Sequence, residues 1–229
     1  MGDMGEKKMK KIRLFVSVEL SGEVRKEISK FLRKINRSHF PVRWVSVENI
    51  HITLAFLGWQ KQKWEVRSEK QEVKAVDLIV DCLEKAIEWI SPFEVKIRGI
   101  GCFPDERRPR VVWLGLAGDL KSLAWLQKRV LRELSRGAGS RFAGGKVGFK
   151  MEERKFIPHL TLGRVNKGTK TPALHNLGFQ LGKMKVGEFG SRIWVDGVSV
   201  MESVLKREGP EYRELANVKA QGPKLKTTT

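Results

Sequence analysis

Two copies of the pattern H-x-T-L are the features of this sequence best suited to chemistry. They place His51 two residues before Thr53, and His159 two residues before Thr161. An imidazole with its ordinary pKa of about 6.5 transfers protons near neutral pH, and a threonine hydroxyl can donate a hydrogen bond to an anionic oxygen. Two such pairs around one groove suit in-line attack on a phosphate diester, in which one histidine accepts a proton and the other donates one.

The repetition of the motif is what favours a functional interpretation, because a single H-x-T segment is most often an ordinary histidine on a sheet surface. The two copies use two of the four histidines and lie in apolar segments, 50–57 and 156–162, that we predict to be strands. Residues i and i+2 of a strand point to the same face, so each histidine shares a face with its threonine. The residues between them fill the opposite face, which we expect helices to cover.

The other segments predict the elements that must carry these two strands. Alternating or apolar runs predict further strands at 12–20, 42–47, 93–97, 110–116, 188–200 and 212–218. Apolar residues at helical spacing predict helices at 22–36, at about 76–90, after Asp119 and from Thr171. The turn-rich segments GIGCFPDERRPR and 137–148 are predicted loops. A similar order of elements in the first and second parts of the chain indicates an α+β fold of two pseudo-symmetric halves, with antiparallel sheets and helices on the outer faces.

The charge balance indicates a polyanionic partner. The 229 residues include 45 Lys and Arg against 26 Asp and Glu, a net charge of +19. Such an excess is typical of proteins that bind nucleic acid. A solvated basic surface without a ligand would have the same composition, so the charge alone does not decide between the two.

Several classes of protein are disfavoured by the composition. No apolar run approaches the roughly 20 residues that span a bilayer, and no secretory signal follows the charged start, so we expect a cytoplasmic protein without membrane contact. The two cysteines form no ligand pattern, and there is no HExxH motif or carboxylate cluster. We therefore expect no metal and no cofactor.

The paired motifs and their flanks resemble the 2H phosphoesterase superfamily, and within it the RNA 2′,3′-cyclic phosphodiesterase branch, also called 2′-5′ RNA ligase. The matching segments are RLFVSVEL, RWVSVENIHITLAFLG, GCFP, RPRVVWLGL, FIPHLTLGRV and MESVLKREGPEYREL. The resemblance implies a two-lobed domain over residues 12–216, with antiparallel sheets lining a central cleft. Residues 1–11 would be an N-terminal extension and residues 217–229 a flexible tail.

The resemblance implies hydrolysis of a 2′,3′-cyclic phosphate at an RNA end to a 2′-phosphate, and in some members ATP-independent 2′-5′ ligation. RNA with cyclic phosphate ends would be the partner of a monomeric protein. His51 and His159 would be the acid/base pair, with Thr53 and Thr161 on the phosphate. Our hypothesis assigns the leaving 3′ oxygen to His51 and the attacking water to His159, but the symmetry of the motifs leaves the exchange of these roles open.

The resemblance also places Arg164 near the phosphate, where its fork of donors suits phosphate oxygens. Strict alternation puts Arg164 on the face opposite His159. Gly163 would therefore have to mark a bulge or a strand end that redirects the arginine. A solvated arginine just after the strand is the alternative.

Three further features are left open by the sequence. Phe15 either stacks on a base or packs in the core, and Arg110 either contacts RNA or is an ordinary surface arginine. The charged segment 59–74 is longer than expected for the family and is either a helix extension or an insert that faces the substrate. Two alternative functions also remain: a phosphodiesterase acting on small cyclic nucleotides or 2′-5′ oligoadenylates, and a non-catalytic RNA-binding module.

Overall fold

The computed structural model describes residues 11–220 apart from 37, 67–70, 138–148, 150–154, 185 and 207–208. Its strands are β1 (Lys11–Val18), β2 (Val42–Trp44), β3 (Ile52–Lys61), β4 (Lys63–Val66), β5 (Gln71–Lys74), β6 (Phe93–Phe103), β7 (Val111–Gly118), β8 (His159–Val165), β9 (Glu188–Val195), β10 (Gly197–Lys206) and β11 (Gly209–Lys219). Its helices are α1 (Gly22–Asn36), the short 3₁₀ helix η1 (Val47–Asn49), α2 (Ala75–Ile87), α3 (Leu120–Arg136) and α4 (Thr171–Lys183).

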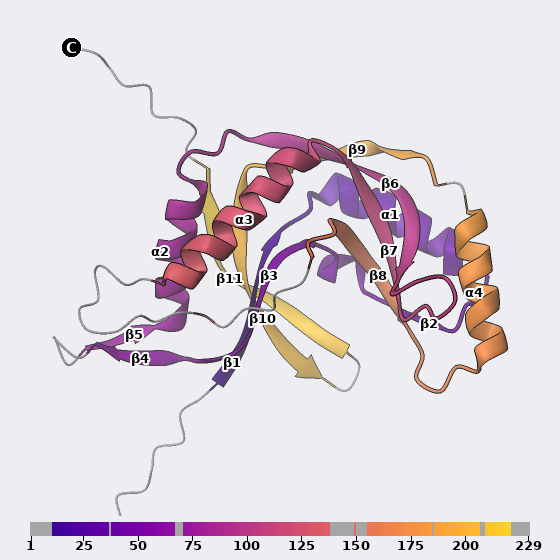
Figure 1. Cartoon of the computed structure of the whole chain (residues 1–229), viewed down its shortest axis with the longest axis horizontal. Helices are drawn as coiled ribbons and strands as arrows, with labels where there is room; N and C mark the ends of the chain where they lie inside the picture. The colour runs from indigo at the N-terminus through magenta and orange to yellow at the C-terminus, as the bar shows by residue number, and fades with distance from the viewer. Residues whose placement is uncertain are drawn as a thin grey trace, which may run out of the picture.

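Nine of the strands form one curled antiparallel sheet, in the order β11–β10–β1–β3–β8–β7–β6–β9, with β2 added beside β8 (Figure 1). The two sheets predicted from the sequence are the two halves of this one sheet. They are joined where Ile52 of β3 pairs with Leu160 of β8, the central residues of the two H-x-T motifs. The predicted α+β class, with antiparallel strands and helices outside them, is confirmed.

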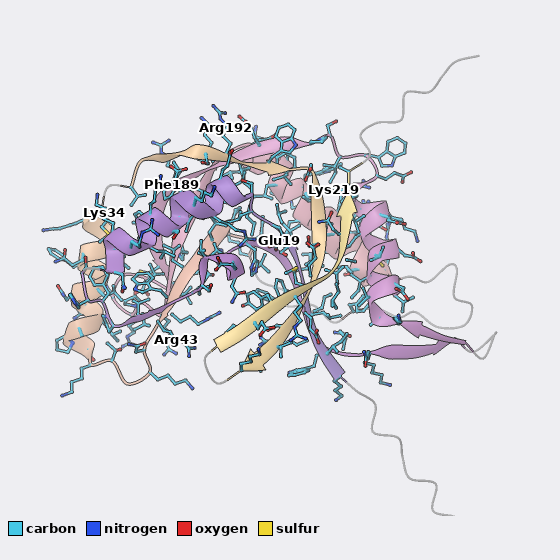
Figure 2. All side chains as sticks on the ribbon, turned by 180° about the vertical axis from the view of Figure 1, so that it is seen from behind. Glu19, Lys34, Arg43, Phe189, Arg192 and Lys219 are labelled. Atoms are coloured by element: carbon cyan, nitrogen blue, oxygen red, sulfur yellow. The ribbon has the colours of Figure 1, made fainter. Side chains whose placement is uncertain are left out.

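The helices cover the outer side of the sheet, two over each half. The helices α2 and α3 pack on each other and on β3, β10 and β11, whereas α1 contacts β9 and α4 contacts β6 (Figure 1). Figure 2 shows Phe189 of β9 beside α1, where its ring meets Phe31 at 5.6 Å between centroids. The order of elements had suggested two successive halves. The structure instead interleaves them, because α1 crosses to the second half and β10 and β11 return to the first.

The apolar periodicities of the sequence account for the core. On β1 the alternate residues Leu14, Val16 and Val18 are buried towards the helices, and α1 buries Val24 and Ile28 at helical spacing. Asp119 caps α3 as predicted, accepting a hydrogen bond from the Ser122 amide. No helix in the described part of the chain has both the length and the apolar character required to cross a bilayer.

The strand β6 corrects the prediction of a loop that begins at Gly99. It continues to Phe103, past an irregularity between Ile97 and Ile100 at which Gly99 has a φ of +80°. A side chain at Gly101 would lie 2.5 Å from the Trp113 ring, so glycine is required there for packing. The glycines that indicated a turn therefore mark a bulged strand.

One segment and two strand ends also differ from the expectations. The segment 59–74 contains the end of β3 and the β4–β5 hairpin, so the suggestion of a helix extension there is wrong. The strand β1 begins at Lys11, the last residue of the predicted extension, and β11 ends at Lys219, three residues into the predicted tail. The predicted loop at 137–148 falls outside the described residues beyond Gly137.

Candidate active site

The two H-x-T motifs lie side by side in the middle of the sheet. Their central residues are Cα partners in an antiparallel ladder, so this register places His51 across from Thr161 and Thr53 across from His159. The four polar side chains therefore alternate around one point on the inner face of the sheet. A single phosphate group at that point would meet an imidazole and a hydroxyl from each half.

The orientation of His51 is set by a backbone carbonyl. Its Nδ1 lies 2.8 Å from the oxygen of Asn49, which can only accept, so Nδ1 carries the proton and donates it. The Nε2 atom, 2.9 Å from the Oγ1 of Thr53, is then the acceptor in the neutral ring. Phe15 stacks on the imidazole at 4.8 Å between centroids and 27° between planes. The basic nitrogen is therefore fixed beside the threonine hydroxyl.

His159 has the same local arrangement. Its Nδ1 lies 2.7 Å from the oxygen of Ile157, again the residue two positions earlier, and donates to it. Phe103 meets the ring edge-on at 4.9 Å between centroids, and Trp113 lies at 6.4 Å. Both imidazoles are thus held in the tautomer whose Nε2 is unprotonated when the ring is neutral.

Burial makes both histidines hard to protonate in the absence of a ligand. Desolvation lowers the pKa of His51 from 6.5 to about 4, although the Asn49 carbonyl raises it and the charge of Arg25 lowers it further. Desolvation and the charge of Arg164 also lower the pKa of His159. A bound phosphate anion would raise both pKa values, because an opposite charge favours the protonated ring.

A bulge brings Arg164 to the site. The ladder pairs Thr161 and Gly163 with consecutive residues of β7, so Leu162 is an extra residue in β8. The extra residue shifts the alternation, and Arg164 falls on the same face as Thr161. The bulge expected at Gly163 is present, and Arg164 lines the same cleft as His51.

The cleft has a volume of about 1190 Å³ and contains most of the predicted site residues. Phe15, Thr53 and Thr161 line it, and His159 lies beside it on the same face of β8 as Thr161. The side chain of Arg110 is exposed just before β7 and is not among the described residues that line the cleft.

Phe15 and Tyr212 form an aromatic wall around His51. Phe15 is only 3% exposed, so it packs and lines the cleft at once. Tyr212 meets the His51 ring at 5.3 Å and the Phe15 ring at 4.9 Å between centroids. Burial raises the pKa of Tyr212, so its hydroxyl remains a neutral donor. The sequence places Tyr212 in the predicted strand 212–218 but does not mark it as a site residue, because β11 returns to this half of the sheet through contacts between distant segments.

Arg25 holds the backbone that leads into the first motif. Its guanidinium donates to the carbonyls of Val47, Glu48 and Ile50, with the two shorter distances at 2.8 and 2.6 Å, and pairs with Glu19 at 2.9 Å. These carbonyls flank the one that orients the first imidazole. No motif in the sequence marked Arg25, since the loop carbonyls to which it donates lie more than twenty residues further along the chain.

We predict that Arg25→Ala lowers kcat/KM on a phosphodiester substrate by about ten- to a hundredfold, because the loop that orients His51 loses its support. The same change removes a charge that lowers the pKa of His51, so this pKa should rise in NMR titrations. Arg33→Ala is the matched control, since Arg33 is exposed on the same helix and its one bond among the described residues is to the Ser29 hydroxyl. Full activity together with an unchanged His51 titration would show that the loop does not depend on Arg25.

Comparison with known proteins places these features in a family. The family model described as LigT like Phosphoesterase matches residues 18–113 and 127–212, which include both motifs. A protein of Aeropyrum pernix named RNA 2′,3′-cyclic phosphodiesterase is 33% identical over 180 residues, covering 79% of this chain and 87% of its own length. A protein of the same name from Methanothermobacter thermautotrophicus is 31% identical, covering 90% of this chain and 97% of its own.

Solved structures share the fold. A crystal structure of a Thermus thermophilus protein superimposes with a TM-score of 0.64 at 24% identity, covering 93% of this chain and all of that one. The crystal structure of E. coli LigT complexed with 3′-AMP gives a TM-score of 0.63 at 24% identity, covering 93% of this chain and 99% of that one. With both halves of the sequence matched by the family model, the chain belongs to the LigT-like phosphoesterase family.

Proposed function

We propose that this protein hydrolyses 2′,3′-cyclic phosphate ends of RNA to 2′-phosphomonoesters, with His51 and His159 as the acid/base pair. The observation that carries the proposal is the antiparallel pairing of the two motifs, which sets each histidine across from the threonine of the other. The substrate class is supported by the names of the relatives at 31–33% identity and by the net charge of +19.

The reaction needs one proton removed and one supplied. The Nε2 of one imidazole takes a proton from water as its oxygen attacks phosphorus, and the other imidazole protonates the 3′ oxygen as the P–O3′ bond breaks. Water is consumed, a 2′-phosphate and a 3′-hydroxyl form, and proton exchange with solvent restores the pair. Because the pairing treats the motifs alike, this geometry assigns neither role to a particular histidine.

The remaining polar groups hold the phosphate. Thr53 and Thr161 donate to its non-bridging oxygens, and Arg164 adds a charge-assisted bond where negative charge develops. The Thr53 hydroxyl, which faces His51 Nε2 in the free protein, turns to the substrate. Side chains supply the acid, the base and the positive charge, so we propose a metal-independent reaction. An RNA 5′-hydroxyl in place of water would give 2′-5′ ligation by the same groups.

The test is incubation of the purified protein, with EDTA, with a short RNA ending in a 2′,3′-cyclic phosphate. We expect a product whose phosphate is on the 2′ oxygen, formed at the same rate without EDTA. Turnover of cyclic mononucleotides alone would favour the small-molecule alternative. RNA binding without turnover of any cyclic phosphate would favour the non-catalytic module and overturn the proposal.

The lowered histidine pKa values predict the pH dependence of kcat/KM. Activity requires one protonated and one neutral imidazole, so it falls below the lower pKa, where both are protonated, and above the higher pKa, where both are neutral. With His51 at about 4 and His159 lowered from 6.5, the profile should be a bell whose maximum lies on the acidic side of 6.5. Initial rates at low substrate concentration and constant ionic strength would measure it. A rate that rises steadily through neutral pH would contradict the two-histidine mechanism.

A further inference from the structure

The cleft continues beyond the phosphate site to a pair of exposed aromatic side chains on β3. Phe56 is 50% exposed and Trp59 is 59% exposed, and both line the cleft. Phe56 is the ladder partner of Phe15, and Trp59 is the partner of Arg13. Because Phe15 and Arg13 are two residues apart on β1, they share a face, and so do their partners.

A bulge in β3 is what places these two aromatics together. Residues 56 and 59 would point to opposite faces of a regular strand. The ladder with β1 shifts between Leu14 and Phe15, next to Gly58, whose φ of +65° suits glycine. The shift brings Phe56 and Trp59 to the inner face of the sheet instead of burying one of them under the helices.

Contacts between rings lead from His51 through Phe15 to the first of the two exposed aromatics, Phe56. The ring of Phe15 lies 4.8 Å from that of His51 and 6.4 Å from that of Phe56. Burial raises the pKa of Tyr212, and Arg13 lies close enough for its charge to oppose this rise. The exposed pair is thus the outer end of the aromatic wall around the site, and not an isolated surface feature.

Two arginines in the cleft have no ion-pair partner among the described residues. Arg13 lies beside its ladder partner Trp59, and Arg43 of β2 lines the same cleft. By contrast, Lys206 in the same cleft is paired with Glu211. Aromatic faces for stacking combined with uncompensated positive charge are the features by which proteins bind single-stranded nucleic acid.

We propose that Phe56, Trp59 and Arg13 form a platform for the RNA nucleotides that precede the cyclic phosphate. Their bases stack on the two aromatic rings, and Arg13 neutralises the phosphodiester that joins them. The platform makes a cyclic-ended oligonucleotide a better substrate than a cyclic mononucleotide. This inference rests on the proposed function only for the identity of the reacting end.

The experiment compares kcat and KM for a cyclic-ended tetranucleotide and for the cyclic mononucleotide of the same terminal base. When an aromatic side chain that stacks on a base is replaced by alanine, affinity for the nucleic acid typically falls by about five- to a hundredfold per base. We therefore expect Trp59→Ala to lower kcat/KM on the tetranucleotide by about this factor, through KM, and to lower it far less on the mononucleotide. Trp59→Phe should restore most of the loss, because it keeps an aromatic face.

Trp89→Ala is the matched control. Trp89 follows α2 and is also 59% exposed, but it is not among the described residues that line the cleft. Equal losses on both substrates in Trp59→Ala, or no loss on either, would overturn the platform. If the wild-type protein turned over neither substrate, the platform could still be tested by binding. Fluorescence anisotropy would measure the affinity for a labelled tetranucleotide that ends in a plain 3′-hydroxyl. Equal affinity of the Trp59→Ala and Trp89→Ala proteins would then overturn the platform independently of the proposed function.

Discussion

Alanine at either His51 or His159 is expected to lower kcat on a cyclic-ended RNA by about 10²–10⁴-fold, the usual contribution of one positioned acid or base. The two rings occupy equivalent places in the antiparallel pair, and each is oriented by the carbonyl two residues earlier. Neither can replace the other, because hydrolysis needs a base and an acid in the same step. Single-turnover rates at saturating RNA would separate this loss from any loss of binding.

The double variant should be only slightly slower than the slower single variant, since residues that act as a unit are strongly non-additive. His175→Ala is the control, because His175 is exposed on α4. A substrate with 4-nitrophenol as leaving group then assigns the roles. That leaving group needs no proton, so the variant lacking the acid recovers and the variant lacking the base does not. Near wild-type rates in both single variants would contradict the mechanism.

Local patterns in the sequence predicted the parts of the site that depend on strand alternation. The His51–Thr53 and His159–Thr161 pairs each fall on one face, as the period of two requires. The helix expected at 22–36 has the same bounds as α1, because its apolar spacing agrees with the surface that it covers. Even the bulge beside Gly163 could be predicted. Strict alternation puts Arg164 on the face opposite His159, whereas the family resemblance puts it near the phosphate, and a bulge reconciles the two.

What the sequence could not predict depends on contacts between distant segments. Tyr212 reaches His51 only because β11 pairs with β10, and β10 pairs with β1, which lies at the opposite end of the sequence. The glycines at 99 and 101 indicated a turn, whereas the Trp113 ring that requires the second of them comes from the neighbouring strand. The sequence shows that residue 101 is a glycine, but it does not show that the Trp113 ring packs over it.

The second large effect is expected at Arg164, whose removal should lower kcat/KM by about 10²–10³-fold, the typical loss when one donor to a developing oxyanion is deleted. Arg164→Lys should recover part of this loss but not all, because an ammonium keeps the charge and loses the planar fork of donors. Arg110→Ala is a useful comparison. The sequence offered both arginines, but only Arg164 lies among the residues lining the cleft, so Arg110→Ala should change the rate little.

Gly163→Ala separates the presence of Arg164 from its placement. A Cβ at Gly163 would lie 2.5 Å from Cγ1 of Val42 and 3.0 Å from the Arg43 carbonyl oxygen, so the bulge would have to move. We expect this variant to lose much of its activity although Arg164 is retained. The value of kcat should fall strongly, whereas the melting temperature should change little. If Gly163→Ala and Arg164→Ala were both as active as the wild-type protein, the phosphate would be held without this arginine. The bulge would then serve only the pairing of β8 with β2 and β7. That it turns Arg164 to the same face as Thr161, against strict alternation, would have no importance for catalysis.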